Sequence, residues 1–268
     1  MSLLESTIMS TIINLYRYPI KGMSPEILQA VSLQTGEGIA FDRWFALAHG
    51  TTAFNPDAPE HFSKTHFLML MKNASLAALN TVYNDNSGIL HIYQGDKLLA
   101  SGVLQDSQGR QALEKFFINY LGDEIRGVPK LLEAPSGYMF SDVDAKVLSC
   151  INLATVRELE KLLKITINPL RFRANIYFDG APAWAESDWV GKTLTLGTAK
   201  VQGVKLIERC AATNVNPETA ERDLQIPQTL MKNYGHRNLG IYVRVIEDGE
   251  VAVNDDFAVN CDIENQTI

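Results

Sequence analysis

Two runs of alternating residues near the end of the chain flank the pair Asp248–Gly249. The run before it reads NLGIYVRVIE, and the run after it reads EVAVNDDFAV. Strict alternation is typical of a strand with one buried face, and Asp-Gly favours the tight turn of a hairpin. We therefore predict an antiparallel hairpin about residues 248–249, in a chain that folds mainly from strands.

Other segments support a strand-rich fold with few helices. A second hairpin is predicted at Gly95–Asp96, between two apolar runs. A helix within 107–123 that ends at Gly122 is predicted from the spacing of Leu113, Phe116, Phe117, Tyr120 and Leu121. Further strands are expected in STIINLYRYPI, EILQAVSLQ, IAFDRWFALA and KTLTLGTAKVQGVKLIER.

Three more helices are expected, each shorter. The first lies within residues 71–85, and the second begins with a capping box at Thr155 and Glu158. The third lies within 221–235 and is broken near Pro227.

The predicted fold class is mixed α+β and β-rich. Pro and Gly cluster over residues 126–145, which favours a boundary there between two barrel-like units. The expected division is a flexible start at 1–9, an N-terminal β-barrel-like domain at 10–125, and a second β-barrel domain with a few peripheral helices at 126–268.

Composition excludes several functional classes. The 268 residues carry a net charge of −7, which argues against a protein that binds nucleic-acid polymers. No apolar run reaches the roughly 18–20 residues of a membrane span. Cys150, Cys210 and Cys261 are widely spaced and form no C-x-x-C pair, so we expect a cytoplasmic protein without disulfides.

Cys210 stands out among the three cysteines. It follows the alternating segment AKVQGVKLIER and precedes TNVNPET, which is rich in turn-forming residues. That context puts a thiol at the end of a strand, where it could be a core thiol, a surface thiol or a catalytic one. Cations such as Arg209 would favour a thiolate, which is a nucleophile and a soft metal ligand. The histidines, at 49, 61, 66, 91 and 236, lie in no recognisable protease context.

Cationic residues recur where predicted strands meet turns. Lys21 lies in YRYPIKG and Arg43 in FDRW. In RFRAN, Arg171, Arg173 and Asn175 stand at a period of two, so on a strand they would share one face and could close on one anion. The alternative is a solvated strand face, and the pattern alone gives the two about even odds.

Together these segments resemble the MOSC domain, named for the C-terminal domain of molybdenum cofactor sulfurases. RCAATNVNPET is similar to its R-C-x-x-T-x-V-x-P-x-T signature, and NPLRFRANIYFDG and the closing run NLGIYVRVIEDGEVAVNDDF match further segments. LYRYPIKGMSPEILQAVSLQTGEGIAFDRWFAL resembles the N-terminal β-barrel domain found with MOSC in the mitochondrial amidoxime-reducing component and its bacterial relatives.

The resemblance implies a molybdenum cofactor with Cys210 as metal ligand and catalytic residue. It further implies that the pterin and phosphate contact Lys21, Arg43, Thr155, Arg171, Arg173, Asn175 and Thr213. The expected reaction is reduction of N-hydroxylated compounds, such as amidoximes or hydroxylamino bases. The chain has no GxGxxG loop and no cysteine cluster for an iron–sulfur centre, so electrons must come from a separate ferredoxin-, flavin- or cytochrome-type donor.

Two alternatives remain at this stage. The protein could carry the cofactor, or sulfane sulfur on Cys210, in partnership with a cysteine desulfurase, and pyridoxal phosphate would then belong to that partner. It could also be a structural scaffold, although that leaves Cys210 and the arginines unexplained.

Overall fold

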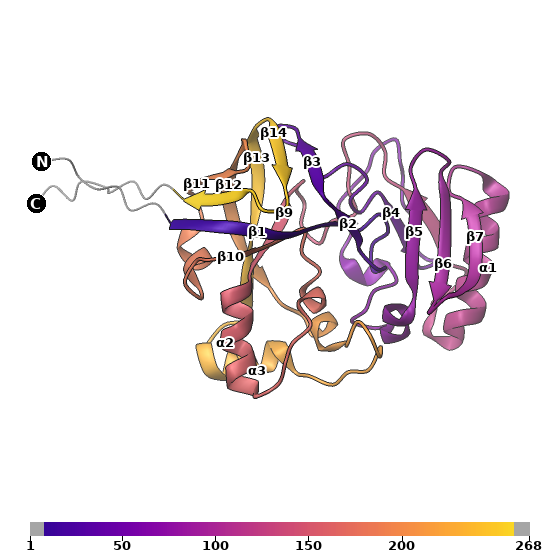
Figure 1. Cartoon of the computed structure of the whole chain (residues 1–268). Coiled ribbons are helices and arrows are strands. Elements are labelled where there is room, and N and C mark those ends of the chain that lie inside the picture. Colours follow the sequence, from indigo (N-terminus) through magenta and orange to yellow (C-terminus); the bar gives the residue numbers. More distant parts are fainter. Residues whose placement is uncertain (1–7, 260–268) are drawn as a thin grey trace, which may run out of the picture.

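Seven strands close into a barrel in the computed structural model, which describes residues 8–259 (Figure 1). Their order is β10-β9-β13-β12-β11-β15-β1, and β1 also pairs with β10 to close the ring. Every pairing is antiparallel except β9 with β10. The strands are β1 (Ile8–Arg17), β9 (Leu148–Asn152), β10 (Ile176–Asp179), β11 (Thr193–Leu196), β12 (Ala199–Glu208), β13 (Asn238–Glu247) and β15 (Asp256–Val259).

The barrel interior is filled by large apolar side chains. Phe178 packs against Trp189 and Phe257, with ring centroids 5.4 and 4.7 Å away. Alternate residues of β13, including Val243 and Val245, point into the same core. Burial of these side chains is the main source of stability in a fold of this kind.

The first half of the chain builds smaller sheets around a separate core that includes Phe45, Leu113 and Phe117. Strand β4 pairs with β8, and β5, β6 and β7 form a three-stranded sheet covered by α1 (Figure 1). The first half also contributes β2 (Glu26–Leu28), which pairs with β1, and β3 (Ala30–Leu33), which pairs with β14. Its other elements are β4 (Phe45–Ala48), η1 (Lys64–His66), η2 (Ala74–Ala78), β5 (Asn80–Asn84), β6 (Ile89–Gln94), β7 (Lys97–Val103), α1 (Ser107–Leu121), η3 (Gly122–Glu124) and β8 (Lys130–Glu133).

Two helices pack together beside the barrel, with Leu159 of α2 and Leu230 of α3 in one apolar cluster (Figure 1). The remaining elements are α2 (Leu153–Leu163), η4 (Pro169–Phe172), η5 (Ala185–Trp189), η6 (Ala211–Asn214), α3 (Ile226–Tyr234) and β14 (Gly249–Ala252). The expectation of a β-rich, mixed α+β fold with few helices is confirmed.

The predicted hairpin about Asp248–Gly249 is wrong. Both runs are strands, but β13 pairs with β9 and β12 on its two edges, so no edge is left for β14. Strand β14 pairs instead with β3. The Asp248 carboxylate accepts hydrogen bonds from the backbone and hydroxyl of Thr35, at 2.7 and 2.6 Å, and so attaches the turn to the end of β3.

Local predictions had mixed outcomes. The β6–β7 hairpin and the helix ending at Gly122 are confirmed. Residues 71–85 form a short 3-10 turn and then β5, not a helix. Pro227 lies in the first turn of α3, where a missing N–H costs nothing, so it starts that helix and does not break it. Helix α2 begins one turn earlier than predicted and is capped by Asn152, whose side chain accepts from Ala154 N.

The strand pairings connect the two halves closely. Of the predicted flexible start, residues 1–7 lie outside the described range, and Ile8 and Met9 belong to β1. Strand β1, which falls in the predicted N-terminal domain, is part of the barrel, and β3 pairs with β14. These pairings cross the predicted boundary between 125 and 126 but do not test where it lies, so the boundary stays a prediction.

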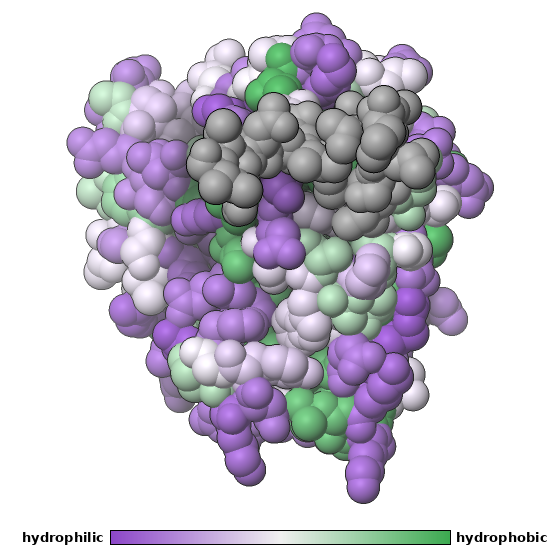
Figure 2. Space-filling view, turned by 90° about the vertical axis from the view of Figure 1, so that its left-hand side faces the viewer, coloured by the Kyte–Doolittle hydropathy of each residue, from purple (hydrophilic) through white to green (hydrophobic). Residues whose placement is uncertain are grey.

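Two further observations concern the polarity of the surface and of the helices. The face in Figure 2 is mostly hydrophilic where grey atoms do not cover it, with small separate hydrophobic patches. Within residues 8–259, no helix combines the length and apolar character needed to cross a membrane.

Candidate functional site

A cavity of about 490 Å³ lies between the barrel and the first half of the chain. Its walls come from the turns that carry Lys21 and Arg43, from residues 139–147, from the η4 segment, and from β12 and the loop after it. These segments are far apart in sequence, so the cavity exists only in the folded chain.

The cavity is strongly cationic although the whole protein is acidic. Seven cationic side chains and three carboxylates line it, whereas the chain carries a net charge of −7. Concentrating one sign of charge in a cavity attracts ligands of the opposite sign. The cations are Lys21, Arg43, Lys64, Arg171, Arg173, Lys205 and Arg209, and the carboxylates are Asp42, Asp142 and Glu208.

Most of the residues predicted for the site do meet in this cavity. Seven of the eight line it, namely Lys21, Arg43, Arg171, Arg173, Asn175, Cys210 and Thr213, and the exception is Thr155. These residues differ in their hydrogen bonds and burial. Some of them can contact a ligand, and others hold the cavity walls in place.

Cys210 is separated from the end of β12 by one residue and immediately precedes η6, as its sequence context indicates. Its side chain is a free, half-buried thiol. Thr213, in η6, donates its hydroxyl to the Cys210 carbonyl at 2.9 Å, so this hydroxyl fixes the loop. The thiol therefore sits in a short, rigid turn at the cavity wall.

Arg209 holds the same turn in place through its hydrogen bonds. Its Nε donates to the Leu239 carbonyl at 2.7 Å and its Nη1 to the Phe172 carbonyl at 2.9 Å. It thus joins β12, β13 and the η4 segment. Its Nη2 is buried and has no hydrogen-bond partner within the described residues.

Arg171 is also tied to the walls. It is 5% exposed, and its guanidinium donates to the Asn214 carbonyl at 3.2 Å and to the Asp223 carboxylate at 2.7 Å. This ion pair and its hydrogen bonds hold the pKa of Asp223 below its usual value. Nε of Arg171 is buried and lacks an acceptor in the part of the chain described.

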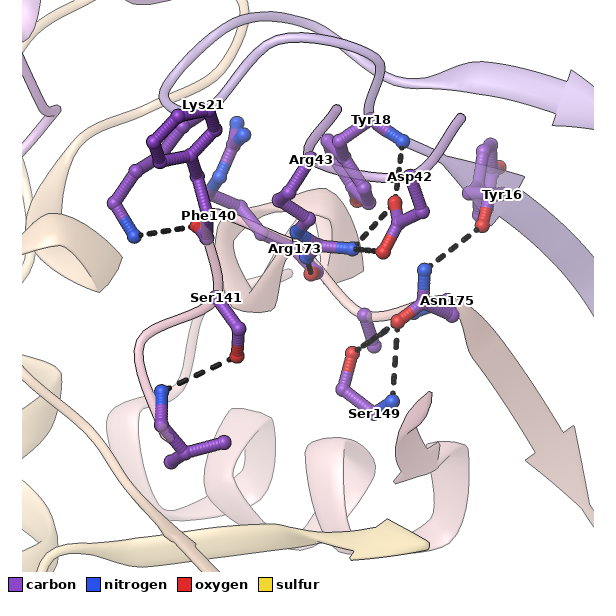
Figure 3. Close-up of polar contacts among 12 residues, drawn as sticks. Tyr16, Tyr18, Lys21, Asp42, Arg43, Phe140, Ser141, Ser149, Arg173 and Asn175 are labelled. Carbon is purple, nitrogen blue, oxygen red and sulfur yellow. Dashed lines mark hydrogen bonds and ion pairs between the residues drawn. The ribbon is translucent and has the colours of Figure 1, made fainter. Parts of the chain in front are cut away.

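Arg173 and Arg43 form a second cationic unit around Tyr18 (Figure 3). Each guanidinium carbon lies 4.5 Å from the Tyr18 ring centroid, and Arg43 Nη2 donates to the Arg173 carbonyl at 2.9 Å. Arg43 is neutralised by Asp42 at 2.6 Å, whereas the Arg173 side chain makes no hydrogen bond to the described residues. Burial, and then the charge of Arg43, lower the pKa of Arg173.

Both residues hold unusual backbone conformations. The φ angles are 50° for Arg43 and 53° for Arg173, in the left-handed region that side chains other than glycine rarely adopt. Such conformations cost about 1–3 kcal/mol and concentrate at functional sites. The prediction that RFRAN is a strand is wrong, because Arg171 lies in a 3-10 turn and Arg173 caps it.

Asn175 hydrogen-bonds mainly within the scaffold. Its Oδ1 accepts from the backbone and hydroxyl of Ser149, at 3.1 and 2.8 Å, and its Nδ2 donates to the Tyr16 carbonyl at 3.2 Å (Figure 3). These bonds join β1, β9 and the start of β10 at the cavity floor. Asn175 therefore holds these strands together beside the arginines, and one N–H of its amide makes no hydrogen bond to the described residues.

Thr155 lies outside the cavity lining. It is completely buried in α2 and donates its hydroxyl to the Glu186 carboxylate at 2.9 Å, while the same oxygen accepts from Trp184 N. Burial raises the pKa of Glu186, which Asn152 also contacts. Thr155 thus serves a buried polar network and not the cavity.

Lys21 is the cation at the other end of the cavity. Its ammonium donates to the Phe140 carbonyl at 2.9 Å and pairs with the Asp142 carboxylate. Burial alone would raise the pKa of Asp142, but the pair with Lys21 lowers it to about 2. The Asp142 carboxylate therefore neutralises the positive charge of Lys21.

Sequence reasoning missed Lys64, which lies in η1 close to Cys210. Burial disfavours its charge, but the Cys210 sulfur and Asp142 outweigh burial, so the pKa of the Lys64 ammonium is raised. Asp142 was missed as well. No motif or alternation marks either residue, and only the tertiary fold brings residue 64 beside residue 210.

The donor set restricts what metal chemistry is possible. Within residues 8–259, no group of three or more His, Cys, Asp or Glu residues could hold a metal ion. A metal in this cavity would take Cys210 as its protein ligand and the rest of its coordination from a bound group. The cationic walls, the buried unpaired nitrogens of Arg171 and Arg209, and the soft thiol fit an anionic, metal-carrying cofactor.

The chain is similar to a known domain family and to several curated proteins. The model of the MOSC domain matches residues 137–258. Mitochondrial amidoxime-reducing component 1 of Mus musculus is 28% identical over 91 residues, which are 34% of this chain and 26% of that protein.

Two further relatives are aligned over longer stretches. Mitochondrial amidoxime reducing component 2 of Macaca fascicularis is 26% identical over 155 residues, covering 53% of this chain and 45% of that protein. Component 2 of Bos taurus is 24% identical over 256 residues, covering 84% of this chain and 72% of that protein. The chain thus spans less than half the length of the first two relatives.

Solved structures give more distant likenesses. The YUAD protein from Bacillus subtilis has a TM-score of 0.44 at 12% identity, covering 96% of this chain and 98% of that one. YiiM from Geobacillus stearothermophilus has a TM-score of 0.33 at 19% identity, covering 42% of this chain and 53% of that one.

Proposed function

We propose that this MOSC-domain protein is a molybdenum-cofactor oxidoreductase that reduces N-hydroxylated compounds, such as amidoximes or hydroxylamino bases. The observation that carries the proposal is one cavity that combines seven cationic side chains with the Cys210 thiol. The names of the mitochondrial relatives supply the type of substrate. We further propose that the protein is cytoplasmic and receives electrons from a separate donor protein.

Arg173 is the best-placed residue to bind an anionic part of the cofactor. Its guanidinium is unpaired among the described residues, and stacking on Tyr18 fixes its direction. Arg171 and Arg209 add positive charge from the walls while their hydrogen bonds hold the loops in place. Hydrogen bonds from such groups to an anion are among the strongest in proteins.

Cys210 would be the protein's ligand to the molybdenum. Lys64 lies close to this sulfur and places a positive charge next to the proposed metal ligand. The same ammonium is placed to hold a proton near the reacting group. When bound, the cofactor supplies a two-electron redox centre, and the chain supplies orientation and electrostatics.

The test compares wild type with Cys210→Ser, both made in a host that synthesises the cofactor. We expect wild type to carry molybdenum and pterin at about one each per chain. Cys210→Ser should keep most of the pterin, because the anion contacts lie elsewhere, but its metal spectrum should change and reduction of benzamidoxime with an artificial donor should fall by orders of magnitude.

Cys150→Ser and Cys261→Ser are the matched controls. Cys150 is completely buried in the barrel core, and Cys261 lies outside the described residues. Both variants should retain turnover. Full turnover by Cys210→Ser would contradict the proposal. Loaded wild type without turnover, but able to accept sulfur from a cysteine desulfurase, would favour the carrier function instead.

A further inference from the structure

A second hollow, of about 560 Å³, adjoins the cationic cavity at Cys210. Met71, Arg209 and Cys210 belong to the walls of both. The other walls of the second hollow come from η6 and α3, and it is the more open of the two. A molecule in this hollow can therefore reach the same thiol as a molecule in the cavity.

The chemistry of the second hollow differs from that of the cavity. Its walls include the apolar side chains of Met71, Ala211, Pro227 and Met231, and no carboxylate lines it. Met231 is 47% exposed, so its side chain is accessible to an apolar group in the hollow. Methionine walls adapt to apolar groups of different shapes.

Three cations line this hollow beside its apolar side chains, namely Arg209, Lys232 and Arg237. Arg237 pairs with Glu208 at 2.5 Å, and both side chains are largely exposed, so the pair is weak and leaves part of the charge unbalanced. Lys232 is exposed, and no carboxylate of residues 8–259 forms an ion pair with it. The hollow therefore combines apolar walls with an uncompensated positive potential.

We propose that this second hollow is the substrate site, and that it takes molecules with an apolar body and an anionic substituent such as a carboxylate. The proposal rests on the proposed function, in which the cofactor fills the cationic cavity and leaves the second hollow as the approach to Cys210. The volume suits a small aromatic compound. Lys232 and Arg237 select against cationic substrates.

The first experiment measures charge preference with the loaded protein. The substrates are benzamidoxime, its 4-carboxylate and its 4-trimethylammonium derivative. Wild type should use the carboxylate with the highest kcat/KM and the trimethylammonium compound with the lowest. Reversing one exposed charge near a charged substrate changes its kcat/KM, relative to that of neutral benzamidoxime, by about fivefold. Lys232→Glu should therefore lower the preference for the carboxylate over benzamidoxime by that factor. Lys97→Glu, on the distant strand β7, should leave all three values unchanged.

The second experiment needs no turnover. Methanethiosulfonates that carry a sulfonate or a trimethylammonium group are compared for their rates of modification of Cys210, in a background of Cys261→Ser. Cys150 is completely buried and does not compete. Lys232→Glu should lower the sulfonate-to-ammonium rate ratio by about 25-fold, because the two reagents respond in opposite directions, and Lys97→Glu should not change it.

The two experiments separate this proposal from the proposed function. Absence of amidoxime turnover, together with the expected change in thiol reactivity, would overturn the reduction reaction but support a charge-selective hollow at Cys210. Unchanged ratios in Lys232→Glu would overturn the substrate site, even if amidoximes are reduced.

Discussion

Arg171 and Arg173 stand two residues apart, but the structure predicts opposite consequences when each is replaced by methionine. Arg171 makes hydrogen bonds to Asp223 and to the Asn214 carbonyl. Arg173 makes none to the described residues and stacks on Tyr18. In the cofactor-free protein, Arg171→Met should therefore cost stability, whereas Arg173→Met should cost little.

The loss for Arg171→Met follows from its two partners. Both hydrogen bonds have the charged guanidinium as donor, and such bonds contribute about 1.5–3 kcal/mol each. Because the Asp223 side chain is 30% exposed, the lower end of this range applies, which gives a total of about 2–3 kcal/mol. In a protein of this size, that corresponds to a fall in Tm of about 4–10 °C.

For Arg173→Met two effects oppose each other. The variant loses a cation–π contact with Tyr18, which contributes about 0.5–2 kcal/mol. It also removes a buried charge that lies near Arg43, and the lowered pKa of Arg173 shows that its surroundings disfavour this charge. We expect the net change in the free energy of unfolding to stay within about 1 kcal/mol.

Thermal unfolding with and without pyrophosphate tests both the predicted stability changes and the predicted binding of an anion by Arg173. Pyrophosphate should raise the Tm of the wild type, because a ligand that binds only the folded state stabilises it. Arg173→Met should keep the wild-type Tm but lose most of this rise. The reasoning is refuted if Arg173→Met lowers Tm as much as Arg171→Met, or if pyrophosphate leaves the wild-type Tm unchanged.

Two further predictions concern residues behind the cavity. Burial raises the pKa of Glu186, so its contribution to stability is present below its usual pKa of 4.5 and is lost as pH rises through the folded value. The stability of Glu186→Gln relative to wild type, measured by urea unfolding, should therefore increase from pH 5 to 8, and a constant difference would contradict this. A Cβ at Gly240 would lie 2.5 Å from Ile151 Cδ1 and 2.6 Å from the Cys150 carbonyl, so Gly240→Ala should cost about 2–4 kcal/mol. Gly235→Ala, with a similar positive φ but open space, should cost about 1 kcal/mol, and equal losses would exclude the predicted clash.

The sequence alone was sufficient to locate those helices and strands that are determined by neighbouring residues. Alternation located β1 and β12, and apolar spacing with Gly122 located α1, because burial of one face and backbone freedom act over a few neighbouring residues. The same locality put Cys210 at the end of a strand, before a turn. Its family signature also led to cationic segments that do meet in one cavity.

Pairing between distant segments could not be predicted from sequence. The strand after Asp248–Gly249 pairs with β3, because both edges of β13 are already occupied inside the closed barrel. That competition depends on the order of all seven strands, and no local pattern encodes it.

The roles of individual side chains were also decided by the tertiary structure. The hydroxyl of Thr155 binds the buried carboxyl of Glu186, and the amide of Asn175 joins three strands, although both residues had been predicted to contact the cofactor. Lys64 reaches Cys210 from a segment without any motif. Sequence determined which residues carry charge or sulfur, but a side chain's role depends on which partners lie within hydrogen-bond distance, and only the folded chain sets those distances.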